Sequence, residues 1–144
     1  MPKRHKFSKS ERDLIVNRAQ RTCEYCRSLQ DYSPDSFEAE HIMPVVRGGS
    51  DDLGNIALAC SGCNKRKSDK ISAFDPISEQ NMPLFNPRTD IWEHHFEWSA
   101  DFSQMLGISP VGRATIEALQ TNREGLVNLR LALFAYGVHP PMRL

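Results

Sequence analysis

Cys23-Glu24-Tyr25-Cys26 and Cys60-Ser61-Gly62-Cys63 are the two motifs that decide how this chain folds. All four cysteines of the protein lie in them, so no thiol is left over. Zinc in proteins is often held by four sulfurs at tetrahedral corners, and each Cys-x-x-Cys turn offers two. The pattern predicts a zinc ion bound by Cys23, Cys26, Cys60 and Cys63. Because sulfur would fill every ligand position, this zinc would be structural.

The interval between the two motifs is long for paired zinc knuckles. It holds 33 residues, whereas about 15 to 20 are usual. The extra length is the size of a strand-loop-strand insertion. A redox dithiol or four unconnected core cysteines are the alternatives, but the equal spacing of both motifs and the lack of a spare cysteine favour zinc.

The composition is that of an ordinary globular domain of 144 residues, with 40% hydrophobic and 25% charged residues. Disordered and fibrous classes are therefore excluded. Eighteen basic and eighteen acidic side chains cancel, so any attraction to nucleic acid must be local. No apolar run approaches the ~18 residues of a membrane span, and no secretory signal opens the chain. We expect a cytoplasmic protein without a membrane partner, in a compartment that keeps thiols reduced.

Local patterns predict the elements around the cysteines. Ser8 and Glu11 have the spacing of a capping box, which predicts a helix over about 9–20 with Leu14, Ile15 and Ala19 packed on the core. Residues 37–42 read as a short strand, which Pro44 ends because proline cannot donate to a ladder. A loop over 45–54, an apolar strand over 56–59 and a short polar helix over 64–70 follow.

The sequence of the second half of the chain predicts a connector, a hairpin and two C-terminal helices. Residues 74–88 hold three prolines among polar residues, which indicates an extended connector. Alternating aromatic and polar residues over 91–108 predict a hairpin. Ser109-Pro110 has the form of a helix start, so we expect helices over about 110–120 and 122–136, the second ended by Gly137.

A series of residues in the interval carries a family resemblance. It runs Glu40-His41-Ile42-Met43-Pro44, then Gly48-Gly49, Asn55, Asn64 and Lys67. In this order and spacing it resembles the HNH endonucleases, the ββα-metal nucleases, over about residues 20–70. The resemblance implies an α+β fold: a small ββα-metal unit stapled by a four-cysteine zinc knuckle, with an N-terminal helix and a C-terminal extension of hairpin plus helices. We expect a single domain over 1–144, with a nuclease core at 20–70, a connector at 71–90 and the extension at 91–144.

The resemblance also implies roles for individual residues. His41 would be the general base, since a histidine titrates near neutral pH, although a lone strand histidine is more often structural. Glu40 and Asn64 would hold a catalytic divalent ion, because carboxylate and amide oxygens suit Mg²⁺ or Mn²⁺. Asn55 would tether the loop behind His41. Each asparagine alone could equally be a turn or cap residue.

Two departures from the family pattern bear on these roles. Asn64 stands where many members have histidine, and Glu40 stands where aspartate is frequent. A regular strand would also point Glu40 and His41 to opposite faces. Both reach one phosphate only if the strand twists or ends there, and Glu38, on the same face as Glu40, is a second candidate ligand.

The interface with nucleic acid is expected beside the predicted metal site. Lysine and arginine side chains there would contact phosphates without reading sequence, although a charge run is often only a solvated face. These residues are Lys67, the strongest candidate, and Arg47, Lys65, Arg66 and Lys70.

The stretch over residues 84–130, which includes much of the extension, resembles an extension found on some small bacterial HNH proteins, and the resemblance assigns it no role. We expect its aromatic residues, Trp92, Phe96 and Trp98, to build a core rather than to stack on bases. His94 and His95 are expected at the surface or in packing.

Two functions remain open from sequence. The first is a metal-dependent endonuclease that hydrolyses DNA phosphodiester bonds, with RNA left open as a second substrate. One such centre cuts one strand at a time, so double-strand cleavage would need a dimer or two visits. The alternative is a non-catalytic zinc-ribbon module that binds nucleic acid or protein. Replacing His41 with alanine separates them, because only the nuclease should lose function.

Overall fold

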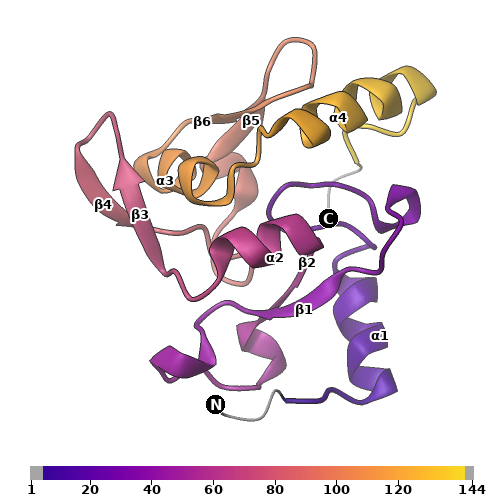
Figure 1. Cartoon of the computed structure of the whole chain (residues 1–144), viewed down its shortest axis with the longest axis vertical. Coiled ribbons are helices and arrows are strands. Elements are labelled where there is room, and N and C mark those ends of the chain that lie inside the picture. The colour runs from indigo at the N-terminus through magenta and orange to yellow at the C-terminus, as the bar shows by residue number, and fades with distance from the viewer. Residues whose placement is uncertain (1–4, 142–144) are drawn as a thin grey trace.

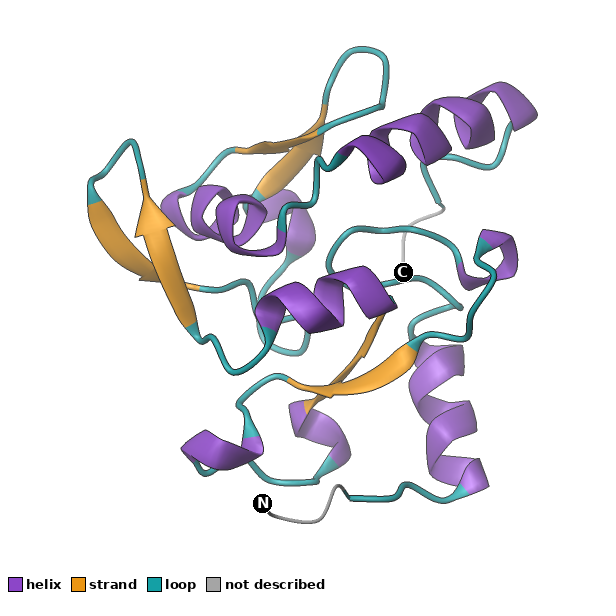
Figure 2. Ribbon diagram, viewed as in Figure 1, coloured by secondary structure: helices purple, strands orange, loops and turns teal. Residues whose placement is uncertain are grey.

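The computed structural model of the chain describes residues 5–141, and this part holds four α-helices and three two-stranded antiparallel sheets (Figures 1 and 2). The predicted α+β class is therefore confirmed. The helices are α1 (Lys9–Arg18), α2 (Ser61–Lys67), α3 (Pro110–Leu119) and α4 (Glu124–Tyr136). The strands pair in chain order: β1 (Glu38–His41) with β2 (Ile56–Ala59), β3 (Ser72–Asp75) with β4 (Gln80–Pro83), and β5 (Phe96–Trp98) with β6 (Met105–Gly107).

The unit β1-β2-α2 lies at the centre of the molecule. Strand β2 is buried along its whole length, and its pairing with β1 places Ile56 opposite His41. Helix α2 starts directly after β2, where the Cys60 side chain caps it by accepting from the Cys63 N–H. Helix α1 packs on β2, while α2 packs on β1 and on α3 of the extension. The expected strand-loop-strand-helix order is confirmed.

Helix α1 differs from its prediction in one residue of the packed face. The Ser8–Glu11 capping box forms, and Ile15 and Ala19 are buried, whereas Leu14 is 47% exposed. Ile15 and Ala19 share a helix face because they are four residues apart. Leu14 lies about 100° around the helix from Ile15 and so faces solvent.

The expected extended connector instead contains the hairpin β3–β4, which packs against α3. Pro76 follows the last residue of β3 and lies in the turn, and Pro83 is the final residue of β4. Proline is compatible with a hairpin at these positions because it interrupts no interior ladder bond. The proline content was therefore misleading as a sign of irregular structure.

The rest of the extension follows the predicted order. The hairpin β5–β6 forms, and α3 begins at Pro110 with Ser109 as its N-cap. Helix α4 ends before Gly137, whose φ of 90° lies in the left-handed region that favours glycine. Trp92 and Phe96 are buried in one core with the cysteines. Within residues 5–141, no helix is both long and apolar enough to cross a membrane.

Candidate active site

The four cysteines converge as the sequence predicted. Their sulfur atoms lie within 4.8 Å of one another and all four residues are buried. The Cys26 and Cys60 sulfurs are 3.7 Å apart. A tetrahedral zinc with Zn–S bonds of about 2.3 Å separates its sulfurs by roughly 3.8 Å. The cluster therefore fits a zinc knuckle.

Two arginines from the extension surround this knuckle. The Arg123 guanidinium donates to the Cys60 sulfur at 3.6 Å and to the Cys63 sulfur at 3.8 Å. Arg130 is buried over the Trp98 ring and donates to the Cys26 carbonyl at 3.2 Å. Four thiolates around Zn²⁺ leave a net negative charge, which these cations offset. Sequence reasoning did not predict a contact between either arginine and the knuckle.

Asn55 connects the two ends of the loop that follows β1. Its side-chain oxygen accepts from the Met43 N–H at 2.8 Å, and its Nδ2 donates to the Met43 and Ser50 carbonyls at 3.0 and 2.8 Å. Gly49 packs so close to the Met43 carbonyl that a Cβ there would lie 1.7 Å from the oxygen. These contacts fix the backbone that follows His41.

His41 ends strand β1 and lies partly open to solvent. Its Nε2 is 2.8 Å from Asp51 Oδ1, and the other Asp51 oxygen lies 3.2 Å from His5 Nδ1. Asp51 was not predicted from sequence. The Asp51 carboxylate can only accept here, so this contact is a hydrogen bond in the tautomer that carries its proton on Nε2, and in that tautomer Nδ1 is the acceptor nitrogen. Asp51 therefore fixes the orientation of the His41 ring.

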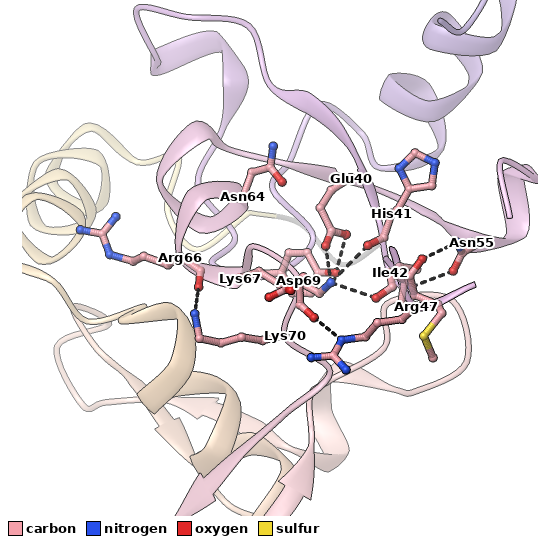
Figure 3. Close-up of polar contacts among 12 residues, drawn as sticks. Glu40, His41, Ile42, Arg47, Asn55, Asn64, Arg66, Lys67, Asp69 and Lys70 are labelled. Carbon is pink, nitrogen blue, oxygen red and sulfur yellow. Dashed lines mark hydrogen bonds and ion pairs between the residues drawn. The ribbon is translucent and has the colours of Figure 1, made fainter. Parts of the chain in front are cut away.

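Glu40 points inward, away from the His41 ring (Figure 3). Its Oε2 accepts from the Tyr25 hydroxyl at 2.9 Å, and Oε1 is 2.6 Å from the Lys67 ammonium. Oε1 nevertheless has no hydrogen bond of good geometry within residues 5–141. Burial raises the pKa of Glu40, although Lys67 and Tyr25 oppose this effect. Glu40 is therefore a buried carboxylate that is paired with Lys67 through one oxygen and hydrogen-bonded to Tyr25 through the other.

A shallow pocket of about 200 Å³ brings the predicted residues together. Glu40, His41 and Asn64 all line it, because β1 ends at His41 and α2 passes beside the strand. The Asn64 amide nitrogen donates to Glu38, which leaves the amide oxygen available. Glu40 and Asn64 thus bring a carboxylate and an amide to the same pocket, and both groups carry oxygens of the kind that Mg²⁺ and Mn²⁺ prefer.

Comparison with protein families agrees with this geometry. Residues 23–70 match the HNH endonuclease family. The HNH segment therefore covers a third of the chain, from the first knuckle cysteine to the end of the basic run. The match indicates nuclease-type activity on nucleic acid. No curated protein matches the chain.

The placement of Lys67 in the HNH segment corrects one prediction. We expected it to be the main phosphate contact, but its side chain is 1% exposed. Its ammonium is enclosed by Glu40 and by the carbonyls of His41 and Ile42, at 3.1 and 2.8 Å. A lysine is fully buried only when such partners replace water. Lys67 therefore neutralises Glu40 instead of facing a nucleic-acid strand.

The other basic residues of the HNH segment remain at the surface. Arg47 is exposed and donates through Nε to the Asp69 carbonyl at 2.6 Å. Lys65, Arg66 and Lys70 are exposed on and just after α2, and Lys70 donates to the Arg66 carbonyl (Figure 3). Four cationic side chains thus lie on the elements that flank the pocket.

Proposed function

We propose that the protein is a metal-dependent endonuclease that hydrolyses phosphodiester bonds in DNA. The observation that carries the proposal is the pocket, where Glu40, His41 and Asn64 meet between elements that bear exposed cations. Lys65, Arg66, Lys70 and Arg47 would contact backbone phosphates on either side of the scissile bond.

The proposed base is Nδ1 of His41. A water in line with the scissile phosphate would give its proton to this nitrogen, and Asp51 would stabilise the imidazolium that forms. Asn55 would keep the ring in place by fixing the Met43 backbone. A divalent cation held by Glu40 and Asn64 would neutralise the charge that builds up on the phosphate.

Lys67 and Tyr25 have a supporting part in this proposal. Both contact Glu40, so they hold its carboxylate in the pocket before a cation binds. Glu38 would orient Asn64 through the amide nitrogen. The alternative that Glu38 is itself a ligand predicts that Glu38→Gln lowers cation affinity as strongly as Glu40→Gln.

A plasmid-nicking assay tests the proposal. Zinc-loaded protein is incubated with supercoiled DNA and Mg²⁺, Mn²⁺ or no added cation, and a single-stranded RNA is tested in parallel. We expect cation-dependent nicking, and a rate lower by roughly 10²- to 10⁴-fold in His41→Ala. His94→Ala is the matched control, because His94 is an exposed histidine outside the pocket.

Zinc content and unfolding temperature should match wild type in both variants. Absence of nicking on every substrate and cation would contradict the nuclease. Equal nicking rates in His41→Ala and His94→Ala would exclude His41 as the base. Binding of nucleic acid without any nicking would favour the zinc-ribbon module.

A further inference from the structure

The segment before α1, residues 5–8, reaches the loop that carries Asp51. The Asp51 carboxylate uses both of its oxygens: Oδ1 lies 2.8 Å from His41 Nε2, and Oδ2 lies 3.2 Å from His5 Nδ1. One carboxylate therefore bridges two imidazoles that are far apart in the sequence. The nuclease proposal uses His41 and Asp51 but leaves His5 without a role.

Phe7 fixes the position of this segment. Its side chain is 7% exposed and belongs to a core cluster with residues of α1 and β2, among them Ile15 and Ile56. Its carbonyl accepts from Arg12 Nη1 at 2.9 Å. Strand β2 pairs with β1, so Phe7 packs on the same two-stranded sheet that carries His41. The residue two positions before Phe7 is therefore held at the loop by packing of its own segment.

The Phe7 ring also lies close to both histidine rings. Its centroid is 4.5 Å from that of His5, in an edge-on arrangement, and 6.1 Å from that of His41. Both separations fall within the ~4.5 to 7 Å typical of aromatic pairs. The segment thus reaches His41 by two routes, an aromatic one through Phe7 and a polar one through His5 and Asp51. Replacing His5 removes the polar route and leaves the aromatic one.

The Asp51 side chain depends on such a second partner. It is 45% exposed and lies in the loop after β1. Asn55 fixes the backbone of that loop through the Ser50 carbonyl, but this contact does not restrain the Asp51 side chain. An exposed side chain loses rotamer freedom when it holds one geometry, and this cost weakens a single contact. With His5 on one carboxylate oxygen, the other oxygen stays directed at His41 Nε2.

We propose that His5 is a positioning residue for the candidate base, a role that rests on the function proposed above for His41. His5 holds the Asp51 carboxylate, which orients the His41 ring, and it does so without lining the pocket itself. Hydrolysis slows when a reacting group is displaced, because the reaction needs one geometry. Exposed pairs contribute weakly, so loss of His5 should slow the reaction by about three- to fivefold.

The first test observes the His41 ring in the absence of nucleic acid. Nuclear magnetic resonance of the zinc-loaded full chain, with isotope-labelled histidine, gives separate signals for the two ring nitrogens, and His41→Ala identifies those of His41. Spectra are recorded without Mg²⁺ or Mn²⁺ at a fixed pH of about 8, above the ordinary histidine pKa. We expect the pattern of a proton on Nε2 in wild type, and signals shifted toward the average of the two tautomers in His5→Ala. His94→Ala, at an exposed histidine, is the control and should leave them unchanged.

The second test measures nicking of supercoiled DNA with Mg²⁺ or Mn²⁺ over a range of DNA concentrations. His5→Ala should lower kcat about three- to fivefold and change KM less than about twofold, because His5 acts on the base and not on the substrate. Adding His5→Ala to Asp51→Ala should lower kcat no further, since His5 acts through Asp51. His94→Ala should match wild type.

Unchanged His41 signals in His5→Ala overturn the positioning role, and so does an unchanged kcat in a chain that nicks DNA. A change confined to KM also overturns it, because it would place His5 on the nucleic acid. Absence of nicking in wild type overturns the nuclease proposal instead. The imidazole spectra then decide alone whether His5 orients the His41 ring.

Discussion

The zinc knuckle and the His41 pocket lie in the same HNH segment but differ in every physical respect. The knuckle is closed, and all four of its cysteines are buried and packed in the main core. The pocket is open, and His41 and Asn64 remain partly accessible. The knuckle also takes its outer contacts from residues 123 and 130, whereas the pocket is built within residues 38–68.

This contrast indicates that the two sites have different roles. A closed site with four sulfurs offers no position to a substrate, so it serves the fold. An open pocket with a histidine, a carboxylate and an amide can exchange water, ions and phosphate. Changes at the knuckle should therefore alter stability, and changes at the pocket should alter chemistry.

Loss of one knuckle sulfur should have the largest effect. Cys60→Ser removes a ligand and the cap of α2, and zinc binding to such sites contributes on the order of 10 kcal/mol. We expect loss of zinc and of the native circular dichroism spectrum, measured with metal analysis of the purified protein. Ser61→Ala, at the next position, is the control and should keep both. A zinc-free Cys60→Ser protein with wild-type stability would contradict a structural knuckle.

Lys67→Met should give the next largest effect, and this effect should be on stability even though Lys67 lies beside the pocket. The change leaves the Glu40 carboxylate buried without its cation, which should lower the free energy of unfolding by about 3 kcal/mol. Urea denaturation measures this loss, and added Mg²⁺ should recover part of it if Glu40 is a cation ligand.

Lys65→Met provides the matched control for Lys67→Met on the exposed face of α2. It should change the free energy of unfolding by less than about 0.5 kcal/mol. Equal stabilities of the two variants would show that the Lys67–Glu40 contact is not maintained in solution.

Arg123→Gln should weaken the knuckle without unfolding the protein. It removes the cation that lies on the Cys60 and Cys63 sulfurs, and such outer contacts change metal affinity about 10- to 100-fold. Zinc transfer to a colorimetric chelator should speed up by about tenfold relative to Arg66→Gln, a variant at an exposed arginine of α2. Equal rates of zinc transfer in the two variants would show that Arg123 does not affect zinc binding.

The smallest expected effect is a pH dependence at His139, far from the pocket in sequence. Burial lowers the pKa of His139 below its ordinary value of 6.5. The folded protein therefore binds this proton more weakly than the unfolded chain does, so the stabilising contribution is present above pH 6.5. It is lost as the pH falls through the lowered pKa.

The change in unfolding temperature between pH 8 and pH 5.5 should therefore be smaller in His139→Gln than in wild type. His94→Gln, at an exposed histidine, should behave as wild type. The same pH dependence in all three proteins would rule out a contribution from His139.

The elements that sequence predicted well are those whose signals are local. The strand at 56–59, the capping box at Ser8 and the start of α3 at Pro110 depend on neighbours a few residues away. The convergence of the cysteines was predictable because zinc chemistry imposes it. The family resemblance added His41, Glu40 and Asn64, which local patterns alone would have left as ordinary polar residues.

The features that sequence missed depend on partners distant in the chain. Lys67 stands in a basic run and looks solvated until Glu40, on the neighbouring strand, is known to lie against it. Asp51 meets His41 only because the intervening loop folds back. The hairpin at 72–83 packs against α3. Its own prolines and polar residues do not predict this packing.

The arginines on the knuckle have a consequence for biosynthesis. The four cysteines leave the ribosome early, but Arg123 is made 60 residues after Cys63, and Arg130 follows it. A chain that bound zinc before residue 123 was made would therefore hold it without these cations, and so less tightly. The polar contacts that surround the zinc site are therefore complete only after α4 has been translated and has docked.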